Sequence, residues 1–183
     1  TGCGRTLVHP EEGAEDIPES CVEQRTFWRP DCSGPACNDP VEVTVVSAGV
    51  HHTCAGLTSG RTLCWGRNSS SQLGDGTSEQ RDRPRPVSGL DDAVGISAGS
   101  THSCALRSNG EVSCWGNNLH GQLGDGTKTN RAEPVDVVGI DDAIDVSVGW
   151  AHTCAVRESG RVSCWGATAY SPSGAPGDTT VHP

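Results

Sequence analysis

The chain contains no methionine, a single lysine and few aromatic residues. Aromatic side chains make up 4 % of its 183 residues, whereas 24 glycines and 11 prolines provide many positions for tight turns. This composition disfavours long helices and helical bundles. No apolar run reaches the roughly 18 residues of a membrane-spanning helix, and the first residues hold no hydrophobic signal-peptide core. We therefore expect short strands joined by turns.

Basic residues are scarce and scattered along the chain. There are 23 acidic and 13 basic residues, which gives a formal net charge of −10, and Lys128 is the only lysine. The arginines do not gather into the basic stripe that a phosphate backbone requires. We therefore expect no nucleic-acid partner, and contact with a membrane only through a lipid anchor.

Nothing in the sequence supports a known enzyme class. The zinc motif H-E-x-x-H and the phosphate-binding loop are missing. The Asp75-Gly76 and Asp125-Gly126 pairs lack the alternating oxygen ligands of a calcium loop, so we expect turns there. The chain is expected not to be an enzyme, and we assign no catalytic residue, cofactor or metal ligand.

A period of fifty residues dominates the sequence. The segments Gly49–Gly66, Gly99–Gly116 and Gly149–Gly166 each contain a histidine, two cysteines ten residues apart and a final Trp-Gly pair. The segments Gln72–Thr77 and Gln122–Thr127 also lie fifty residues apart. Repeats of this length, with short alternating stretches between glycine turns, are typical of propeller blades of about four strands.

Four strands are expected in the second unit, each bounded by turn residues. Equivalent strands are expected in the other units. The expected strands are Ile96–Gly99, Thr101–Arg107, Glu111–Trp115 and Glu133–Val138.

The units resemble the repeats of the regulator of chromosome condensation family. The resemblance rests on Ala98-Gly99, His102, the Gly110 turn, Trp115-Gly116 and the loop Asn118–Gly124. Repeats of this family form seven-bladed β-propellers. The resemblance therefore implies an all-β fold made of propeller blades, as a partial propeller or as part of a seven-bladed ring.

The resemblance covers about residues 41–166, which is fewer than three complete blades. The third unit is truncated, because its glutamine-leucine-glycine loop is missing. The chain is expected to be a piece of a longer propeller, a ring closed by self-association or a short array stabilised by disulfides. The expected divisions are a Cys-rich acidic linker or small disulfide-bonded segment at 1–40, and three repeats within 41–183, at about 41–88, 89–138 and 139–183.

The cysteines ten residues apart are expected to pair within one hairpin of each unit. In the second unit, a three-residue loop with a left-handed glycine makes Arg107 and Glu111 partners. Counting back along both strands places Cys104 opposite Cys114, at a non-hydrogen-bonded position where Cα atoms approach to about 4.5 Å. The expected disulfides are Cys54–Cys64, Cys104–Cys114 and Cys154–Cys164.

Zinc is the alternative for these cysteines, because a histidine lies near each pair. His102, Cys104 and Cys114 form one such set, and the other units repeat it. Each set offers three ligands, whereas a structural zinc site uses four. We therefore expect the histidines to pack and to form hydrogen bonds near a blade edge.

A tryptophan recurs at one place in each unit, beside a glycine. We expect Trp65, Trp115 and Trp165 to pack between blades, with the indole N–H bound to a carbonyl oxygen. Trp150 has no tryptophan counterpart in the other units. It is a candidate for an exposed contact residue.

The first forty residues hold four further cysteines among acids, prolines and glycines. Four cysteines permit three connectivities, so the pairing of Cys21, Cys32 and Cys37 stays open. The segment Thr1–Cys3 resembles the end of a bacterial lipoprotein cleavage motif. Cys3 is therefore a candidate lipidation site.

The expected function is that of a secreted or cell-surface binding module, since dense cysteines indicate an oxidising compartment. Loops at one propeller face would contact a protein partner, which the sequence does not identify. The alternative is a structural partial propeller that self-associates into a ring or larger oligomer. Guanine-nucleotide exchange, which the resemblance also implies, and zinc-dependent catalysis rank below both. The candidate contact residues are Arg67, Asn68, Arg83, Asn118, His120 and Trp150.

Overall fold

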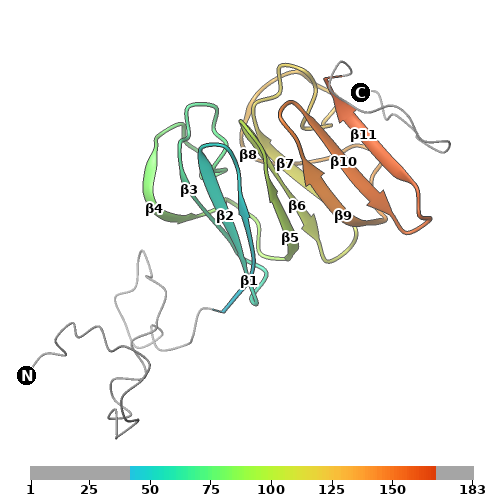
Figure 1. The fold of residues 1–183 in the computed structure, drawn as a ribbon, viewed down its shortest axis with the longest axis horizontal. Helices are drawn as coiled ribbons and strands as arrows, with labels where there is room; N and C mark the ends of the chain where they lie inside the picture. The colour runs from blue at the N-terminus through green and yellow to red at the C-terminus, as the bar shows by residue number, and fades with distance from the viewer. Residues whose placement is uncertain (1–41, 168–183) are drawn as a thin grey trace, which may run out of the picture. The chain divides into compact units, whose positions relative to one another are not determined.

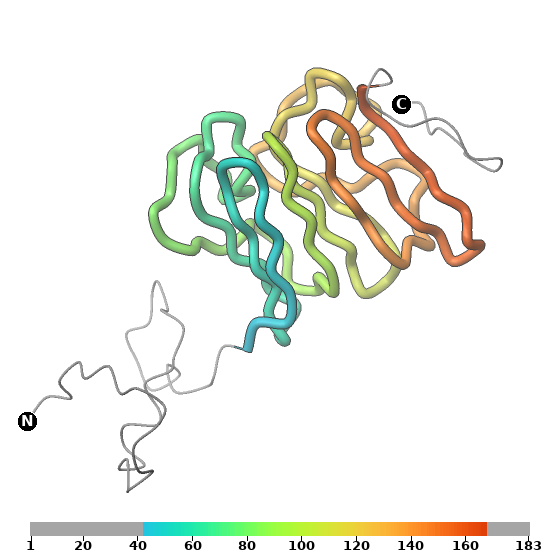
Figure 2. The backbone as a smooth tube through the Cα atoms, in the orientation of Figure 1, coloured from blue at the N-terminus to red at the C-terminus, as the bar shows by residue number. Residues whose placement is uncertain are grey.

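The structure is a computed structural model that describes residues 42–167. In this range it contains eleven β-strands and no helix, and hence no helix able to cross a membrane. The strands form three antiparallel sheets that lie side by side in chain order (Figures 1 and 2). The expected all-β fold of propeller blades is confirmed.

Each sheet is formed by one repeat. The first sheet contains β1 (Val43–Ala48), β2 (His52–Leu57), β3 (Thr62–Gly66) and β4 (Arg81–Pro86). The second sheet contains β5 (Ala93–Ala98), β6 (His102–Arg107), β7 (Val112–Gly116) and β8 (Arg131–Asp136). The third sheet contains β9 (Ala143–Val148), β10 (His152–Arg157) and β11 (Val162–Gly166). Strand β5 packs against both β1 and β9, so these three strands form the inner edges of the sheets, and β4 and β8 are outer edges.

Two strands of the second sheet differ in position from the prediction. Strand β5 begins at Ala93 instead of Ile96, and the Ala93 N–H donates to the Gly60 carbonyl. A bulge between Ala93 and Gly95 interrupts the alternation of buried and exposed residues, so the start of the strand was not predicted. Strand β8 covers Arg131–Asp136, earlier than expected, because a register shift in its pairing with β7 brings the arginine into the strand.

The second hairpin of each sheet has the register predicted from its turn. In the second sheet, Gly110 adopts the left-handed conformation (φ 84°) that the turn requires. Cys104 then lies opposite Cys114, with the Cα atoms 4.1 Å apart and the sulfur atoms at bonding distance. The same Cα separation of 4.1 Å is found for the pairs Cys54–Cys64 and Cys154–Cys164.

Tryptophans close the two apolar clusters between the sheets. Trp115 is fully buried and donates its indole N–H to the carbonyl oxygen of Gln72 at 2.9 Å. Trp165 donates in the same way to the carbonyl of Gln122 at 3.0 Å. Each of these tryptophans therefore binds a loop of the preceding sheet, as predicted. Trp65 belongs to the first sheet, which has no preceding sheet within residues 42–167.

Replacing Cys104 and Cys114 together by alanine should lower the free energy of unfolding by about 2–3 kcal/mol, because a bridge closing a loop of about eleven residues restricts the unfolded chain. Urea unfolding under non-reducing conditions measures the change. The variant C154A/C164A is the matched control, since its loop has the same length, and it should lose a similar amount. A C104A/C114A variant as stable as the oxidised parent would show that the bridge contributes nothing.

Candidate binding surface

The longest loops of the described chain gather at one end of the three sheets. In each of the two four-stranded sheets, a backbone hydrogen bond joins a long loop to a short turn. In the second sheet the Asn117 N–H donates to the Thr101 carbonyl at 2.9 Å. The Arg67 N–H makes the equivalent bond to His51 at 2.9 Å. We call this end the loop face. It consists of the turns 49–51, 99–101 and 149–151 and the loops 67–80 and 117–130.

Each long loop is closed around one buried asparagine. The side-chain amide of Asn118 donates to Asp125 at 2.9 Å and to the Thr127 carbonyl at 3.1 Å, and its oxygen accepts from the Leu123 N–H at 3.0 Å. Asn68 makes the corresponding bonds in the first loop, and both asparagines are fully buried. The prediction that Asn68 and Asn118 contact a partner is therefore wrong, because their amides are used inside the loops.

An aspartate in each long loop connects the loop to the outer strand. Asp125 accepts from the Thr127 hydroxyl at 2.8 Å and pairs with Arg131, the first residue of β8, at 2.8 Å. Burial raises the pKa of Asp125, but hydrogen bonds from Thr127 and Arg131 outweigh it and hold the pKa below its usual value. The same contacts in the first loop join Asp75, Thr77 and Arg81.

Only the aspartate-glycine turn of these loops was predicted from the sequence. The burial of the asparagine and the bonds made by the threonine and the arginine of each loop were missed. The asparagine, the threonine and the arginine each recur fifty residues later, and this recurrence could have identified them from the sequence. We call this shared set the loop frame. Its members are Asn68, Asp75, Thr77 and Arg81 in the first loop, and Asn118, Asp125, Thr127 and Arg131 in the second.

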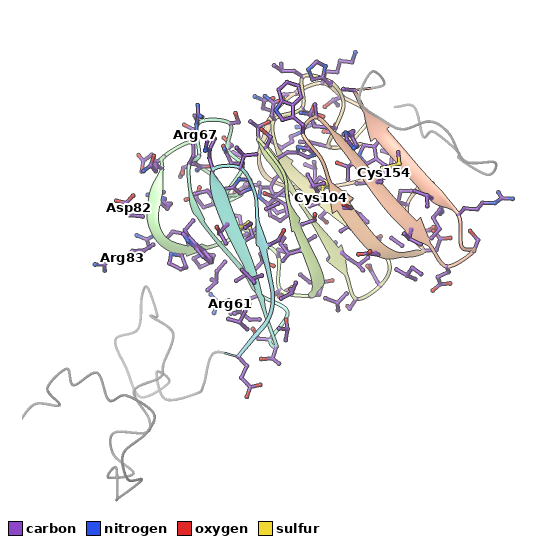
Figure 3. All side chains as sticks on the ribbon, in the orientation of Figure 1. Arg61, Arg67, Asp82, Arg83, Cys104 and Cys154 are labelled. Atoms are coloured by element: carbon purple, nitrogen blue, oxygen red, sulfur yellow. A yellow bond between two sulfur atoms is a disulfide. The ribbon has the colours of Figure 1, made fainter. Side chains whose placement is uncertain are left out.

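The residues at the loop tips differ between the two repeats. The second loop presents Leu119, which is 64 % exposed, and His120, which is also exposed. The first loop has Ser69 and Ser70 at these positions, preceded by the exposed Arg67 (Figure 3). Different side chains are therefore displayed on nearly identical frames. Two candidate contacts, Arg67 and His120, lie on the loop face as exposed side chains.

Trp150 adds a large aromatic side chain to the loop face. It is 61 % exposed, and Val50, at the equivalent position of the first repeat, is 59 % exposed. A groove of about 340 Å³ runs along the three short turns between these residues. The sixth candidate contact, Arg83, is exposed but lies on β4 and not on this face (Figure 3).

The repeated histidines lie between the sheets, where they form hydrogen bonds. His102 Nε2 is 2.9 Å from the Thr153 hydroxyl, and His52 Nε2 is 2.7 Å from the Ser103 hydroxyl. The Ser103 hydroxyl itself donates to the Gln72 carbonyl at 2.9 Å. Nε2 of His52 must therefore carry the proton, and the imidazole is neutral when Nδ1 is unprotonated. The histidines thus help to dock one sheet on the next.

The ligand sets considered for zinc are not assembled. In each set the two cysteine sulfurs are bonded to each other, and Nε2 of His52 and His102 faces a hydroxyl group. Within residues 42–167, no group of three histidine, cysteine, aspartate or glutamate side chains is arranged to hold a metal ion. The geometry of these residues does not fit zinc.

The remaining cysteines lie outside the described residues. The lipidation of Cys3 and the pairing of Cys21, Cys32 and Cys37 therefore stay predictions. The three cysteine pairs in residues 42–167 that are at disulfide distance are consistent with an extracellular location.

The buried histidines should make the protein less stable in acid. Burial, with a smaller effect of neighbouring histidines, lowers the pKa of His102 to about 3 and that of His52 to about 4. In the unfolded chain the pKa of each is about 6.5. The unfolded state therefore binds more protons than the folded state below about pH 6.5. The stability present above that pH should fall by up to about 1.4 kcal/mol per pH unit for each histidine.

The variant H102Q tests this effect, because glutamine can still donate to Thr153 but does not titrate. Its free energy of unfolding, measured by urea titration, should fall less than that of the wild type between about pH 7 and about pH 4.5. H120Q, which changes an exposed histidine, is the control and should follow the wild type. The same pH dependence in H102Q and in the wild type would contradict the assignment.

Two family models match the repeats. Both describe the regulator of chromosome condensation (RCC1) repeat. One matches residues 59–106 and 109–156, and the other matches residues 43–72, 93–122 and 143–170. The chain is also similar to the ultraviolet-B receptor UVR8 of Arabidopsis thaliana. The two are 45 % identical over 53 residues, which are 28 % of this chain and 12 % of the receptor.

Solved structures share the arrangement of the sheets. Human WBSCR16 has a TM-score of 0.62 and 20 % identity over 68 % of this chain and 33 % of its own. Prp20p from Saccharomyces cerevisiae, described with its binding to Gsp1p and histones, has a TM-score of 0.62 and 21 % identity, covering 71 % of this chain and 32 % of its own. The yeast RCC1 (Prp20) bound to Kap60 has a TM-score of 0.61 and 20 % identity, covering 74 % and 34 %.

At these identities the solved structures establish the fold alone. The chain spans about a third of their length and a smaller part of the plant receptor. The family models, in contrast, recognise the repeats themselves, and the matches of the first model cover half of the chain. The chain therefore belongs to the RCC1 repeat family.

Proposed function

We propose that the chain is a non-enzymatic, extracytoplasmic binding module that presents the loop face to a protein partner. The observation that carries the proposal is the contrast between the loop frames and the loop tips. The frame residues are the same in both long loops and bond to one another inside each loop. The tip residues differ and face the solvent. Recognition sites are commonly built in this way, as variable loops on a rigid scaffold.

The rigid frames favour binding because little conformational freedom is left to lose. Loops that are ordered before binding avoid the entropic cost of being ordered by the partner. Trp150 and Arg67 supply two of the three residue types, tryptophan, tyrosine and arginine, that contribute most often to binding energy at protein interfaces. His120 and Leu119 lie on the neighbouring loop and extend this surface.

The remaining parts of the proposal rest on the cysteines and on the histidines. Three paired hairpins would be reduced in the cytosol, which favours a secreted or cell-surface protein. The histidines His52 and His102 are buried and bonded to hydroxyl groups, so they are not accessible to a substrate. The Prp20p structure is described with binding to proteins, which supports a protein partner for this chain by analogy of fold.

Self-association into a ring or larger oligomer is the second candidate function. It is favoured by Val46 of β1, which is 64 % exposed, whereas its counterparts Ile96 and Val146 are each 8 % exposed against the preceding sheet. The first sheet thus has an uncovered docking side. A second copy would cover it incompletely, however, because its third repeat lacks the glutamine loop that Trp65 would need as an acceptor. We therefore rank this function second.

The variant L119S/H120S/W150V tests the proposed function. Each change introduces the residue found at the same position of the first repeat, so the frames should stay intact. The biotinylated chain is incubated with the secreted and surface proteins of its source cells, and the retained proteins are quantified by mass spectrometry. Proteins retained by the wild type should be lost from this variant, because its exposed contact side chains are gone.

The control variant is R161E, which changes an exposed residue at the opposite end of the third sheet and should retain the same proteins. Thermal unfolding of all three proteins shows that folding is unchanged. Equal retention by the wild type and by L119S/H120S/W150V would reject the loop face as the binding surface. A mass that rises with protein concentration in all of them would favour self-association instead.

A further inference from the structure

One of the three disulfides is accessible to solvent, whereas the other two are covered. All four cysteines of the first and second pairs are 0 % exposed. In the third pair, Cys164 is 4 % exposed and Cys154 is only partly buried. Figure 3 shows Cys154 on β10, in the last of the three sheets. The three pairs have the same register in their hairpins, so the difference in exposure comes from what surrounds them.

The first two disulfides are each covered by the sheet that follows. The sulfur of Cys54 lies 4.0 Å from the Ser103 hydroxyl of the second sheet. The sulfur of Cys104 lies 3.9 Å from the Thr153 hydroxyl of the third sheet. The cysteines of a sheet therefore point toward the next sheet. Within residues 42–167 no sheet follows the third one, so the side of it that carries the last disulfide is open.

The side chains around the third disulfide are uncovered as well. Val162 lies two residues before Cys164 on β11, and therefore on the same side of the strand. It is 43 % exposed, whereas its counterpart Val112 in the second sheet is 0 % exposed. We call this open side of the third sheet the end face. Its members are His152, Cys154, Val156, Val162 and Cys164.

We propose that the Cys154–Cys164 disulfide is a site of thiol–disulfide exchange, at which a small thiol becomes attached to Cys154. The rate of this exchange depends on the access of the attacking thiolate to a sulfur atom, and accessible disulfides are the labile and regulatory ones. Covered disulfides react only after local opening or unfolding of the protein. The end face needs no such opening.

The exchange is balanced in atoms and electrons. The thiolate attacks Sγ of Cys154, which is the more exposed cysteine of the pair. A sulfur–sulfur bond to Cys154 forms, the bond to Cys164 breaks, and Cys164 leaves as a thiolate that takes up a proton from water. One disulfide and one thiol are consumed and one of each is produced, so no further oxidant or reductant takes part.

The proposal is tested by incubating the oxidised protein with reduced glutathione under native conditions. Samples are quenched with N-ethylmaleimide at timed intervals, and each cysteine pair is mapped by peptide mass spectrometry. The Cys154–Cys164 pair should react at least about tenfold faster than the other two pairs, which react only when the structure opens. At early times glutathione should be found on Cys154 and maleimide on Cys164. In denaturing urea the three pairs should react at similar rates, because their cover is lost.

The variant V162E distinguishes attack on the folded end face from attack after unfolding, because it places a negative charge beside the disulfide. At low salt it should react about threefold more slowly than the wild type with glutathione, whose thiolate form has a net negative charge. With cysteamine, whose ammonium group offsets its thiolate, the rate should stay close to that of the wild type. The control V94E adds the same charge at an exposed valine of β5 and should leave both rates unchanged.

Equal rates for the three pairs in the folded protein would overturn the proposal, as would no reaction of Cys154–Cys164 with glutathione. Equal slowing in V162E and V94E would also overturn it, because the attack would then not depend on the end face. Thermal unfolding shows whether both variants are folded. None of these measurements involves a partner at the loop face, so their outcome is independent of the proposed function.

Discussion

The main-chain carbonyl of one glutamine holds each sheet to the sheet before it. The Gln72 carbonyl accepts two hydrogen bonds from the second sheet, from the Trp115 indole and from the Ser103 hydroxyl, each at 2.9 Å. Both lone pairs of that oxygen are thereby used. The glutamine lies inside the loop that Asn68 closes, so the shape of the loop and the docking of the next sheet depend on each other. The loop face is ordered because it takes part in the packing of the sheets.

This polar docking compensates for a small apolar core. Aromatic residues make up 4 % of the chain, and the sheets contribute mainly alanine, valine and cysteine to the two apolar clusters. A network of buried hydrogen bonds stabilises this interface, although Nδ1 of His52 and Nδ1 of His102 have no hydrogen-bond partner among residues 42–167. The histidines belong to the same network, because Nε2 of His52 lies 2.7 Å from the Ser103 hydroxyl. The disulfides hold together the hairpins that carry these residues. Burial in this interface lowers the pKa of His52 and of His102, which accounts for the expected loss of stability in acid.

The sequence predicted the parts of the fold that depend on local spacing. The turn at Gly110 determined the hairpin register and with it the position of Cys104 opposite Cys114. The recurrence of Trp115 and Trp165 beside glycine predicted that each indole N–H binds a carbonyl, but it did not identify the glutamines that supply these carbonyls. The buried state of Asn118 was not predicted, because an asparagine in a glycine-rich loop is most often exposed.

Exchange of the tryptophan indole protons, followed by nuclear magnetic resonance in deuterated water, tests the docking network most directly. Trp115 and Trp165 should exchange slowly, because their N–H groups are bonded to buried carbonyls between sheets. Trp150, which is largely exposed, should exchange fast. Protection of Trp115 and Trp165 alone among these three would establish that the glutamine loops hold the sheets together. Equally fast exchange of all three in the folded protein would contradict the account.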